Sequence, residues 1–119
     1  MLFRSRIRAM LRRREEFHPD LIHFGDLTLN MQSGAISVDE ISFQLPKQEY
    51  RLMEQLMLNH TMFMSSEDLL VNAWGFNTEA DINSVWLYVS YLRKRLSAMN
   101  SKVEIASKRN IGYKLEFQP

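Results

Sequence analysis

Hydrophobic residues recur with the period of a helix between residues 85 and 96. Val85, Val89, Leu92 and Leu96 follow one another at intervals of four, three and four residues, so their side chains share one helix face. The opposite face combines hydrogen-bonding, apolar and cationic groups from Asn83, Leu87, Ser90, Tyr91 and Lys94, with Arg93 on one flank and Arg95 on the other. The pattern predicts a helix with one buried face and one face that is free to contact a partner.

The period shortens to two on either side of the helical part of the chain. From residue 21 to residue 45, apolar and polar residues alternate, and turns at Gly25-Asp26, Ser33-Gly34 and Asp39-Glu40 divide the segment into about four short strands. This alternation predicts a small antiparallel sheet with one solvated face. Near the C-terminus, the extended runs 103–106 and 113–117 enclose the basic tip Ser107-Lys108-Arg109-Asn110 and predict a β-hairpin.

Two further helices are expected between the sheet and the helix that contains Val85. Pro46 begins one that runs to about Asn59, because proline is tolerated in the first turn. Its buried side consists of Leu52, Met53, Leu56 and Met57. Ser65 and Asp68 resemble the start of a capping box for a helix that buries Leu69, Leu70 and Ala73 and ends at Trp74-Gly75. The order predicts an α+β fold, a winged helix-turn-helix with an N-terminal four-stranded antiparallel sheet, three helices and a C-terminal β-hairpin wing.

Length, composition and motif content exclude several classes of protein. A chain of 119 residues with 45% hydrophobic residues has enough material for one domain with a core. No apolar run approaches the roughly 18–20 residues of a membrane span, and the absence of cysteine removes disulfides and thiolate catalysis. His18, His23 and His60 lack metal-ligand spacing, and no nucleophile motif or glycine-rich phosphate loop is present. We therefore expect no enzyme activity, no metal, no cofactor and a cytoplasmic location.

The overall net charge of +1 conceals three regions of different sign. Residues 1–14 hold six arginines and no acid, residues 15–83 hold two basic residues against twelve acidic ones, and residues 84–119 hold seven basic residues against two acidic ones. Phosphates respond to the local field, so the basic C-terminal third is the expected footprint of a nucleic acid, and the acidic middle is expected to face away. The mixed helix face suits the major groove of DNA, and a cationic hairpin beside it suits a phosphate or the minor groove. Helix and hairpin together predict DNA binding.

Several motifs between residues 21 and 117 resemble the winged-helix effector domain of OmpR/PhoB-type response regulators. They are F-G-D-L-T-L (Phe24–Leu29), L-x-x-x-E-Y (Leu45–Tyr50), S-x-E-x-L-L (Ser65–Leu70), A-W-G (Ala73–Gly75), V-x-x-x-V-x-x-L-R-K-R-L (Val85–Leu96) and R-x-x-G-Y-x-L (Arg109–Leu115). They occur in the family's order and at its spacing, which makes the resemblance specific. It implies a sequence-specific DNA-binding transcriptional regulator, the effector domain of a two-component response regulator.

The first residues resemble the end of the receiver domain of such a regulator. Residues 2–16 have an amphipathic helical pattern, and the arginine-rich run 6–14 is similar to the family's last receiver helix. Pro19 interrupts this pattern, since proline disfavours helix in the residue before it. We therefore expect residues 1–16 to be the end of the receiver helix and linker, 17–20 a linker and 21–119 the DNA-binding domain. The chain is expected to be a fragment that lacks the receiver.

Individual residues can be assigned to parts of a DNA complex. We expect Asn83, Leu87, Ser90 and Tyr91 to face bases in the major groove, Arg93 and Lys94 to contact phosphates, and Lys108 and Arg109 of the wing to contact DNA, Arg109 in the minor groove. The resemblance implies that the loop of Phe76, Asn77, Thr78, Glu79, Ala80 and Asp81 contacts RNA polymerase. It also implies two copies bound as a homodimer to tandem direct repeats of double-stranded DNA. A sensor histidine kinase would act through the missing receiver, and no membrane partner is expected.

The recognition face departs from the family's usual residues. The family usually has Arg at Asn83, Asp at Trp86 and His at Tyr88, and its usual T-V-R-G in the hairpin is replaced by Ser107-Lys108-Arg109-Asn110. Loss of basic groups from this face predicts a target sequence that differs from the family's usual one, while the fold is unaffected.

Other interpretations of the same residues remain open. A winged helix that binds a protein and not DNA would use Trp86, Leu87 and Tyr91 as an apolar docking patch. The basic helix is also compatible with a merely solvated surface helix, and the arginine-rich segment 4–14 with a helix on a membrane surface. Trp86 and Tyr88 either pack against the sheet or hairpin, or meet a partner.

Overall fold

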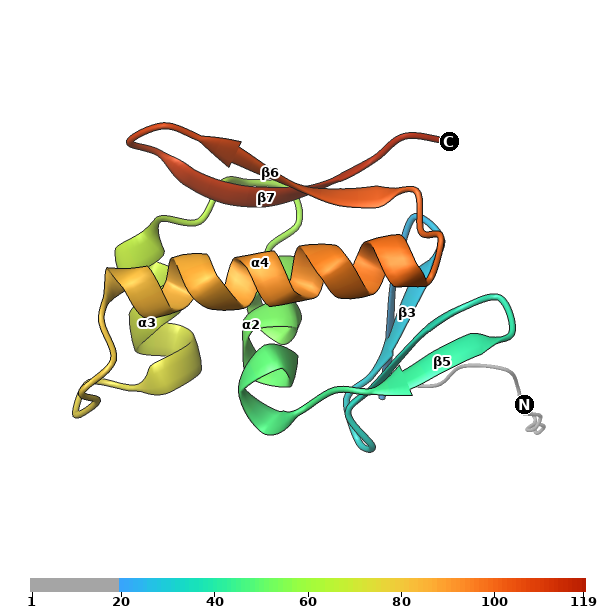
Figure 1. Cartoon of the computed structure of the whole chain (residues 1–119), viewed down its shortest axis with the longest axis horizontal. Helices are drawn as coiled ribbons and strands as arrows, with labels where there is room; N and C mark the ends of the chain where they lie inside the picture. The colour runs from blue at the N-terminus through green and yellow to red at the C-terminus, as the bar shows by residue number, and fades with distance from the viewer. Residues whose placement is uncertain (1–19) are drawn as a thin grey trace, which may run out of the picture.

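The computed structural model describes residues 20–119, which form a sheet, three helices and a hairpin in that order (Figure 1). The strands of the sheet are β2 (Leu21–Phe24), β3 (Leu27–Asn30), β4 (Ala35–Val38) and β5 (Ile41–Gln44), the helices are α2 (Lys47–Leu58), α3 (Ser66–Trp74) and α4 (Ile82–Ala98), and the hairpin consists of β6 (Val103–Lys108) and β7 (Gly112–Phe117). This order confirms the predicted α+β architecture. The amphipathic helix expected at residues 2–16 lies outside the described residues.

The N-terminal sheet is antiparallel, with its strands in the order β2-β3-β4-β5. Every second residue of the two central strands is buried, namely Leu27, Leu29, Ile36 and Val38. The edge strand β5 adds little to the core, since Phe43 is half-buried and Ile41 is exposed. The sheet therefore has the single buried face that the two-residue period predicts.

The first two helices begin and end close to the predicted residues. Pro46 directly precedes α2, which buries Leu52, Met53, Leu56 and Met57 as predicted. Ser65 caps α3, because the backbone N–H of Asp68 donates to the Ser65 hydroxyl oxygen at 3.0 Å. This bond satisfies one of the amides left unpaired at a helix start. Gly75 follows the last residue of α3 with a φ of +97° and ends the helix.

α4 crosses the molecule in front of α2 and α3, and the hairpin runs along its upper side (Figure 1). Val85, Val89, Leu92 and Leu96 are all buried, as their spacing predicts. A capping box fixes the start of the helix. The Ser84 N–H donates to Asp81 Oδ1 and the Asp81 N–H donates to Ser84 Oγ, both at 3.3 Å. Asp81, predicted as a residue of the loop that contacts RNA polymerase, therefore also has a structural role as the cap of α4.

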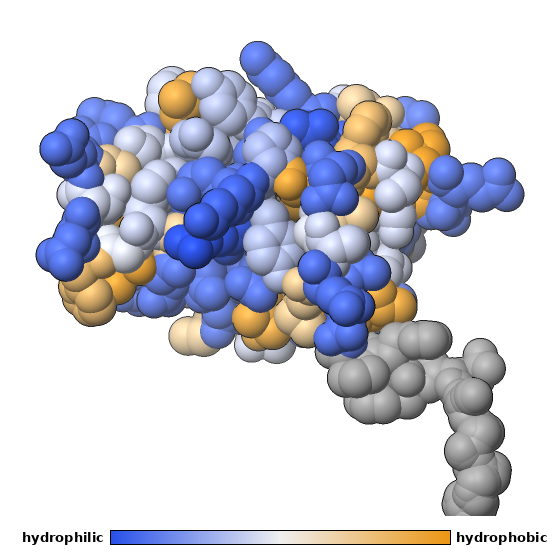
Figure 2. Space-filling model, turned by 90° about the horizontal axis from the view of Figure 1, so that it is seen from below, coloured by the Kyte–Doolittle hydropathy of each residue, from blue (hydrophilic) through white to orange (hydrophobic). Residues whose placement is uncertain are grey.

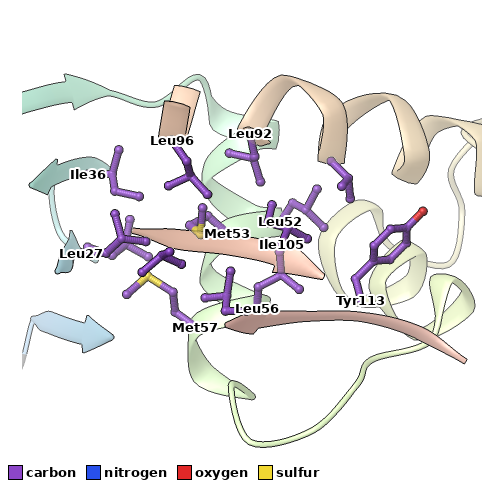
Figure 3. Close-up of a cluster of buried hydrophobic side chains, with 14 of the residues drawn as sticks. Leu27, Ile36, Leu52, Met53, Leu56, Met57, Leu92, Leu96, Ile105 and Tyr113 are labelled. Carbon is purple, nitrogen blue, oxygen red and sulfur yellow. The ribbon is translucent and has the colours of Figure 1, made fainter. Parts of the chain in front are cut away.

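The hairpin packs on the helices through one apolar face (Figure 3). Ile105 and Tyr113 belong to the same buried cluster as Leu92 of α4 and Leu52 of α2. The backbone of Tyr113 also pairs with Met64, on the link before α3, through N···O distances of 2.8 and 2.9 Å. The wing is thus attached both to the helices and to the link between α2 and α3.

The turn of the hairpin lies later in the chain than predicted. β6 continues through Ser107 and Lys108, which the sequence assigned to the tip, and Lys108 is in register with Gly112. The connection consists of Arg109, Asn110 and Ile111. Polar residues suggested a tip, but strand pairing uses backbone groups that every residue except proline possesses, so it extends over exposed polar residues.

We expect Gly112→Ala to destabilise the domain, because the wing backbone passes closely over the link before α3. A Cβ at Gly112 would overlap the carbonyl oxygen of Met64 and lie 2.9 Å from the backbone nitrogen of Ser65, and Gly112 has a φ of +148°. Gly75→Ala is the matched control, since Gly75 also has a positive φ but nothing lies within 4 Å of an added Cβ. Both variants should lose ~1–3 kcal/mol of unfolding free energy to backbone strain.

Overlap with the backbone should make the loss for Gly112→Ala larger by a further ~1–3 kcal/mol. Urea denaturation of the two variants measures the difference. Equal losses would show that the close approach to Met64 is not the reason for glycine at this position.

Candidate nucleic-acid interface

The outer face of α4 is open to solvent on the side opposite its buried stripe. The exposed residues of α4 are Ile82, Asn83, Trp86, Leu87, Tyr91, Arg93, Lys94, Ser97 and Ala98. Among them, Leu87 is 41% exposed and Trp86 is 61% exposed. The half-buried Ser90 donates its hydroxyl hydrogen to the carbonyl oxygen of Leu87 at 2.6 Å. The hydroxyl oxygen therefore remains available to accept a hydrogen bond.

Arg93 connects α4 to the wing. Its Nε and Nη2 both donate to the carbonyl oxygen of Ile105 in β6, at 3.1 and 2.7 Å. Hydrogen bonds from a charged donor are stronger than those between neutral groups. The side chain is still exposed, so its other N–H groups remain accessible. The predicted phosphate contact of Arg93 stays a prediction, and the structure adds a second role, that of holding the hairpin against α4.

Arg95 is used inside the domain. Its Nη2 lies 3.1 Å from Oε1 of Glu49 in α2, and its guanidinium carbon lies 5.5 Å from the centre of the Phe43 ring in β5. The Glu49 side chain is only 9% exposed, and a buried carboxylate without its cation is costly. Lys94 lies between these two arginines in the sequence. Unlike them, it forms no hydrogen bond or ion pair with another group of residues 20–119.

A hollow of about 670 Å³ separates the wing tip from the starts of α3 and α4. It is lined by residues 107–113 of the wing, by Ser65, Ser66 and Glu67 at the start of α3, and by Ile82 of α4. Arg109 is exposed at the tip, and Lys108 Nζ lies 5.8 Å from the centre of the Phe63 ring. Glu67 belongs to the acidic segment, so one carboxylate of that segment lies beside the cationic wing tip.

Trp86 and Tyr88 lie in different environments. Tyr88 is half-buried and packs edge-on against Trp74 of α3 and against Tyr91, with ring centres 5.3 and 5.2 Å apart. Tyr88 therefore packs within the helical part of the domain, against α3, and not against the sheet or hairpin as the first of its two alternatives has it. Trp86 is 61% exposed, which excludes packing against the sheet or hairpin and leaves contact with a partner as its remaining alternative. The environments of Trp86 and Tyr88 differ because residues two apart on a helix are rotated by about 200° relative to each other, so their side chains lie on nearly opposite sides of the helix.

The loop at residues 76–81 connects α3 to α4. Phe76 is 85% exposed, more than any other large hydrophobic residue of the described region. The backbone N–H of Ala80 donates to the Thr78 hydroxyl oxygen at 3.0 Å, and Asp81 caps α4. Asn77 and Glu79 are exposed. The loop therefore has a defined conformation with an apolar ring at its surface, and a D-x-x-S spacing was the sequence signal for its capping end.

Metal-binding clusters and membrane-spanning helices are absent from the described region. Within residues 20–119, no three His, Asp or Glu side chains are placed to hold a metal ion, and no helix has the length and apolar content to cross a bilayer.

Burial, and then a hydrogen bond to Glu54, raise the pKa of Tyr50 to about 12. The Tyr50 hydroxyl donates to Oε2 of Glu54 at 2.9 Å and its oxygen lies 3.3 Å from the carbonyl oxygen of Met31, so Tyr50 contacts the segment after β3 and lies outside the face described above.

The face seen from below in Figure 2 is mainly hydrophilic. Its hydrophobic residues form small separate spots at the margins and the lower edge. Broad exposed apolar patches mark many protein-binding surfaces, and this side of the molecule, opposite the hairpin of Figure 1, carries none.

Comparison with known sequences identifies relatives. A family model described as "Transcriptional regulatory protein, C terminal" matches residues 40–115, which include α2, α3, α4 and most of the hairpin. The response regulator ArlR of Staphylococcus epidermidis is 32% identical over 109 residues, and that of Staphylococcus aureus is 33% identical over the same length. Each match covers 92% of this chain and 49% of the relative, so the chain spans about half the length of these relatives.

Solved structures share the fold. The DNA-binding domain of Klebsiella pneumoniae RstA, in complex with the RstA box, has a TM-score of 0.67 and 25% identity, over 82% of this chain and 96% of that one. The AdeR DNA-binding domain, in complex with an intercistronic region, has a TM-score of 0.71 and 19% identity, over 81% and 99%. The DNA-binding domain of E. coli CadC has a TM-score of 0.74 and 22% identity, over 86% and 96%.

These likenesses confirm the predicted winged-helix fold. β6 and β7 form the wing, and α4 has the position of the third helix. The chain belongs to the C-terminal domain family of transcriptional regulatory proteins, the winged-helix DNA-binding effector domains of OmpR/PhoB-type response regulators.

Proposed function

We propose that this domain regulates transcription by binding specific DNA sequences, as the effector of a two-component response regulator. The observation that supports this best is that the start of α4 and the cationic wing tip border one hollow. An α-helix fits the major groove, and a neighbouring hairpin can reach phosphates or the minor groove. Lys94 on α4 and Lys108 and Arg109 on the wing supply positive charge on both elements.

Base contacts are assigned to the outer side of α4 between its second residue, Asn83, and Tyr91. The Asn83 amide both donates and accepts, which fits a bidentate contact with adenine. Leu87 is suited to the methyl group of thymine. Ser90 already donates to the carbonyl of Leu87, so it would act as an acceptor from a base. Tyr91 completes this face, with its ring supported by Tyr88.

Phosphate contacts are assigned to the cations beside these residues. Lys94 is exposed and has no bonding partner within residues 20–119. Arg93 would bind a phosphate through the N–H groups that Ile105 does not use. Arg109 would enter the minor groove from the wing tip, with Lys108 at the adjoining phosphate.

The partners of a whole regulator follow from the family resemblance. Two copies would bind tandem direct repeats as a homodimer on DNA, and the loop at residues 76–81 would contact RNA polymerase through its exposed Phe76. A sensor histidine kinase would act through a receiver domain. Residues 1–16 would be the end of its last helix and the start of the linker, and residues 17–20 would continue the linker to the DNA-binding domain at residues 21–119. The match to only about half of the response regulator ArlR supports the presence of a further domain in such a regulator. A bacterial chromosome lies in the cytoplasm, so the domain would act there.

A protein-interaction module that does not bind DNA is the second candidate. Trp86, Leu87 and Tyr91 are exposed apolar residues on one helix, which is the observation in its favour. Apolar docking responds little to salt, whereas DNA binding weakens steeply as salt rises, because counterions are displaced from phosphates. A salt titration therefore separates the two functions.

Duplex binding should show this salt dependence, and Lys94→Ala should reduce the slope of log affinity against log salt by ~1. Binding to all duplexes should weaken alike, with the melting temperature unchanged, because Lys94 makes no bond within residues 20–119. Arg93→Ala should have two effects. It should reduce the salt slope as Lys94→Ala does, and it should lower the unfolding free energy by about 1 kcal/mol, since it removes the hydrogen bonds to Ile105. Fluorescence anisotropy titrations and thermal melts measure both effects.

Lys102→Ala is the matched control, because it removes the same charge from the residue directly before β6, at the end of the hairpin away from the tip. Its salt slope should stay at the wild-type value. An unchanged slope for Lys94→Ala would remove Lys94 from the interface, and salt-insensitive binding to a protein with no duplex binding would favour the second candidate.

Asn83→Ala should relax discrimination at one or two base pairs, by ~1–3 kcal/mol for a bidentate contact. Selection from random DNA, followed by sequencing of the retained duplexes, compares the variant with wild type. Asn77→Ala, which removes an exposed amide from the loop before α4, should return the wild-type motif. Asn83 reads no base if its variant also returns that motif.

Arg109→Ala should weaken DNA binding most at sites flanked by A-tracts, where the narrow minor groove has an enhanced negative potential. The melting temperature should hardly change, because an exposed ion pair contributes only ~0–1 kcal/mol. Arg109→Lys should restore binding in part, since an ammonium is more strongly hydrated than a guanidinium. Equal binding of Arg109→Ala to every flank, or unfolding of the variant, would contradict this role.

A further inference from the structure

The first eleven residues of α4 carry no charge. From Ile82 to Leu92 there is no Lys, Arg, Asp or Glu. Arginine or lysine usually reads guanine, and a carboxylate reads the cytosine amino group, so this part of the helix lacks both readers of a G·C pair. Arg93 bonds to Ile105 and Arg95 bonds to Glu49. Before Arg93, the outer face therefore offers only amide, hydroxyl and hydrocarbon groups, and Lys94 is the cation that follows them on this face.

The hydrocarbon on this face forms two rows. Ile82 and Trp86, four residues apart, are 43% and 61% exposed, and Leu87 and Tyr91, also four apart, are 41% and 39% exposed. A helix turns about 100° per residue, which places the polar residues between the two rows. These polar residues are Asn83, Ser90 and Lys94. None of the four apolar residues belongs to the buried core.

The row of Ile82 and Trp86 lies on the side of α4 that faces the wing. Ile82 lines the hollow that Arg109 also lines. Trp86 is about 20° around the helix axis from Arg93, and Arg93 bonds to the wing strand β6. A duplex with its major groove on α4 and its backbone at the wing would meet both rows.

We infer that α4 selects A·T base pairs through contacts of Trp86 and Leu87 with the C5-methyl groups of thymine. The methyl group is the apolar feature that thymine presents in the major groove, and the amide of Asn83 matches adenine. This inference rests on the proposed DNA-binding function and adds the class of base pair that the site reads. It also accounts for large apolar side chains that the core does not use.

A protein is the competing occupant of this surface. The polar residues between the rows interrupt the apolar area, which a protein-docking patch would keep continuous. Lys94, Lys108 and Arg109 lie around the rows and the hollow, against the single acid Glu67 among the hollow's lining residues. This balance of charge favours a polyanion over a protein surface of mixed charge.

The test replaces thymine by uracil, one position at a time, in the duplex that the wild-type domain selects from random DNA. Uracil keeps the base pairing and the phosphate charges but lacks the C5-methyl group. Loss of one buried methyl group should weaken binding about fourfold, which corresponds to the ~0.8 kcal/mol gained on burying one such group. We expect this response at the thymines in contact with α4.

Two variants assign the response to side chains. Trp86→Ala and Leu87→Ala should each lose the response to uracil at the thymine that the residue contacts and keep it elsewhere. Both side chains are exposed, so the melting temperature should not change. Leu58→Ala is the matched control, because Leu58 is 54% exposed at the end of α2, and it should keep the full wild-type response.

The outcomes separate the inference from the proposed function. Equal binding of thymine and uracil duplexes by the wild-type domain would overturn the inference and leave DNA binding intact. A response to uracil that both variants retain in full would also overturn it, since other side chains would then contact the methyl groups. A wild-type domain that binds no duplex at any salt concentration would overturn the proposed function, and the inference with it.

Discussion

The burial of one face of α4 determines where every other part of the candidate interface lies. Val85, Val89, Leu92 and Leu96 pack in a core that also contains residues of α2, α3 and β6. Each such side chain contributes ~1.5–3 kcal/mol when it is fully buried. Rotation of the helix would expose this stripe and bury Lys94, so the outer face is held toward solvent. A helix that reads bases needs this fixed rotation, because the groove presents its donors and acceptors in a fixed pattern.

The same helical geometry gives three consecutive basic residues three different environments. Successive side chains diverge by about 100°, so Arg93 reaches β6, Arg95 reaches Glu49 of α2, and Lys94 extends outward. A count of basic residues therefore overstates the charge that α4 offers to phosphates. With two guanidinium groups bonded inside the domain, the apolar and amide groups of the outer face become the larger part of its chemistry.

The wing is held to the body by contacts of different kinds. Ile105 and Leu115 enter the core, Arg93 bonds to the backbone of β6, and Tyr113 pairs with Met64. The turn around Arg109 extends beyond these contacts. A hairpin fixed in this way presents its cations at a constant position relative to α4, so DNA binding would require little further ordering of the wing.

The sequence by itself determined the elements, because the signals for them are local. The spacing of Val85 and Val89, the alternation around Leu27 and Leu29, and the cap at Ser65 each follow from the backbone geometry of one element. Tertiary structure decided which groups remain available for a partner. Arg93 bonds to a residue 12 positions away and Arg95 to one 46 positions away, and Tyr88 packs on α3. No local period encodes these partners, because they depend on how the elements come together around the core.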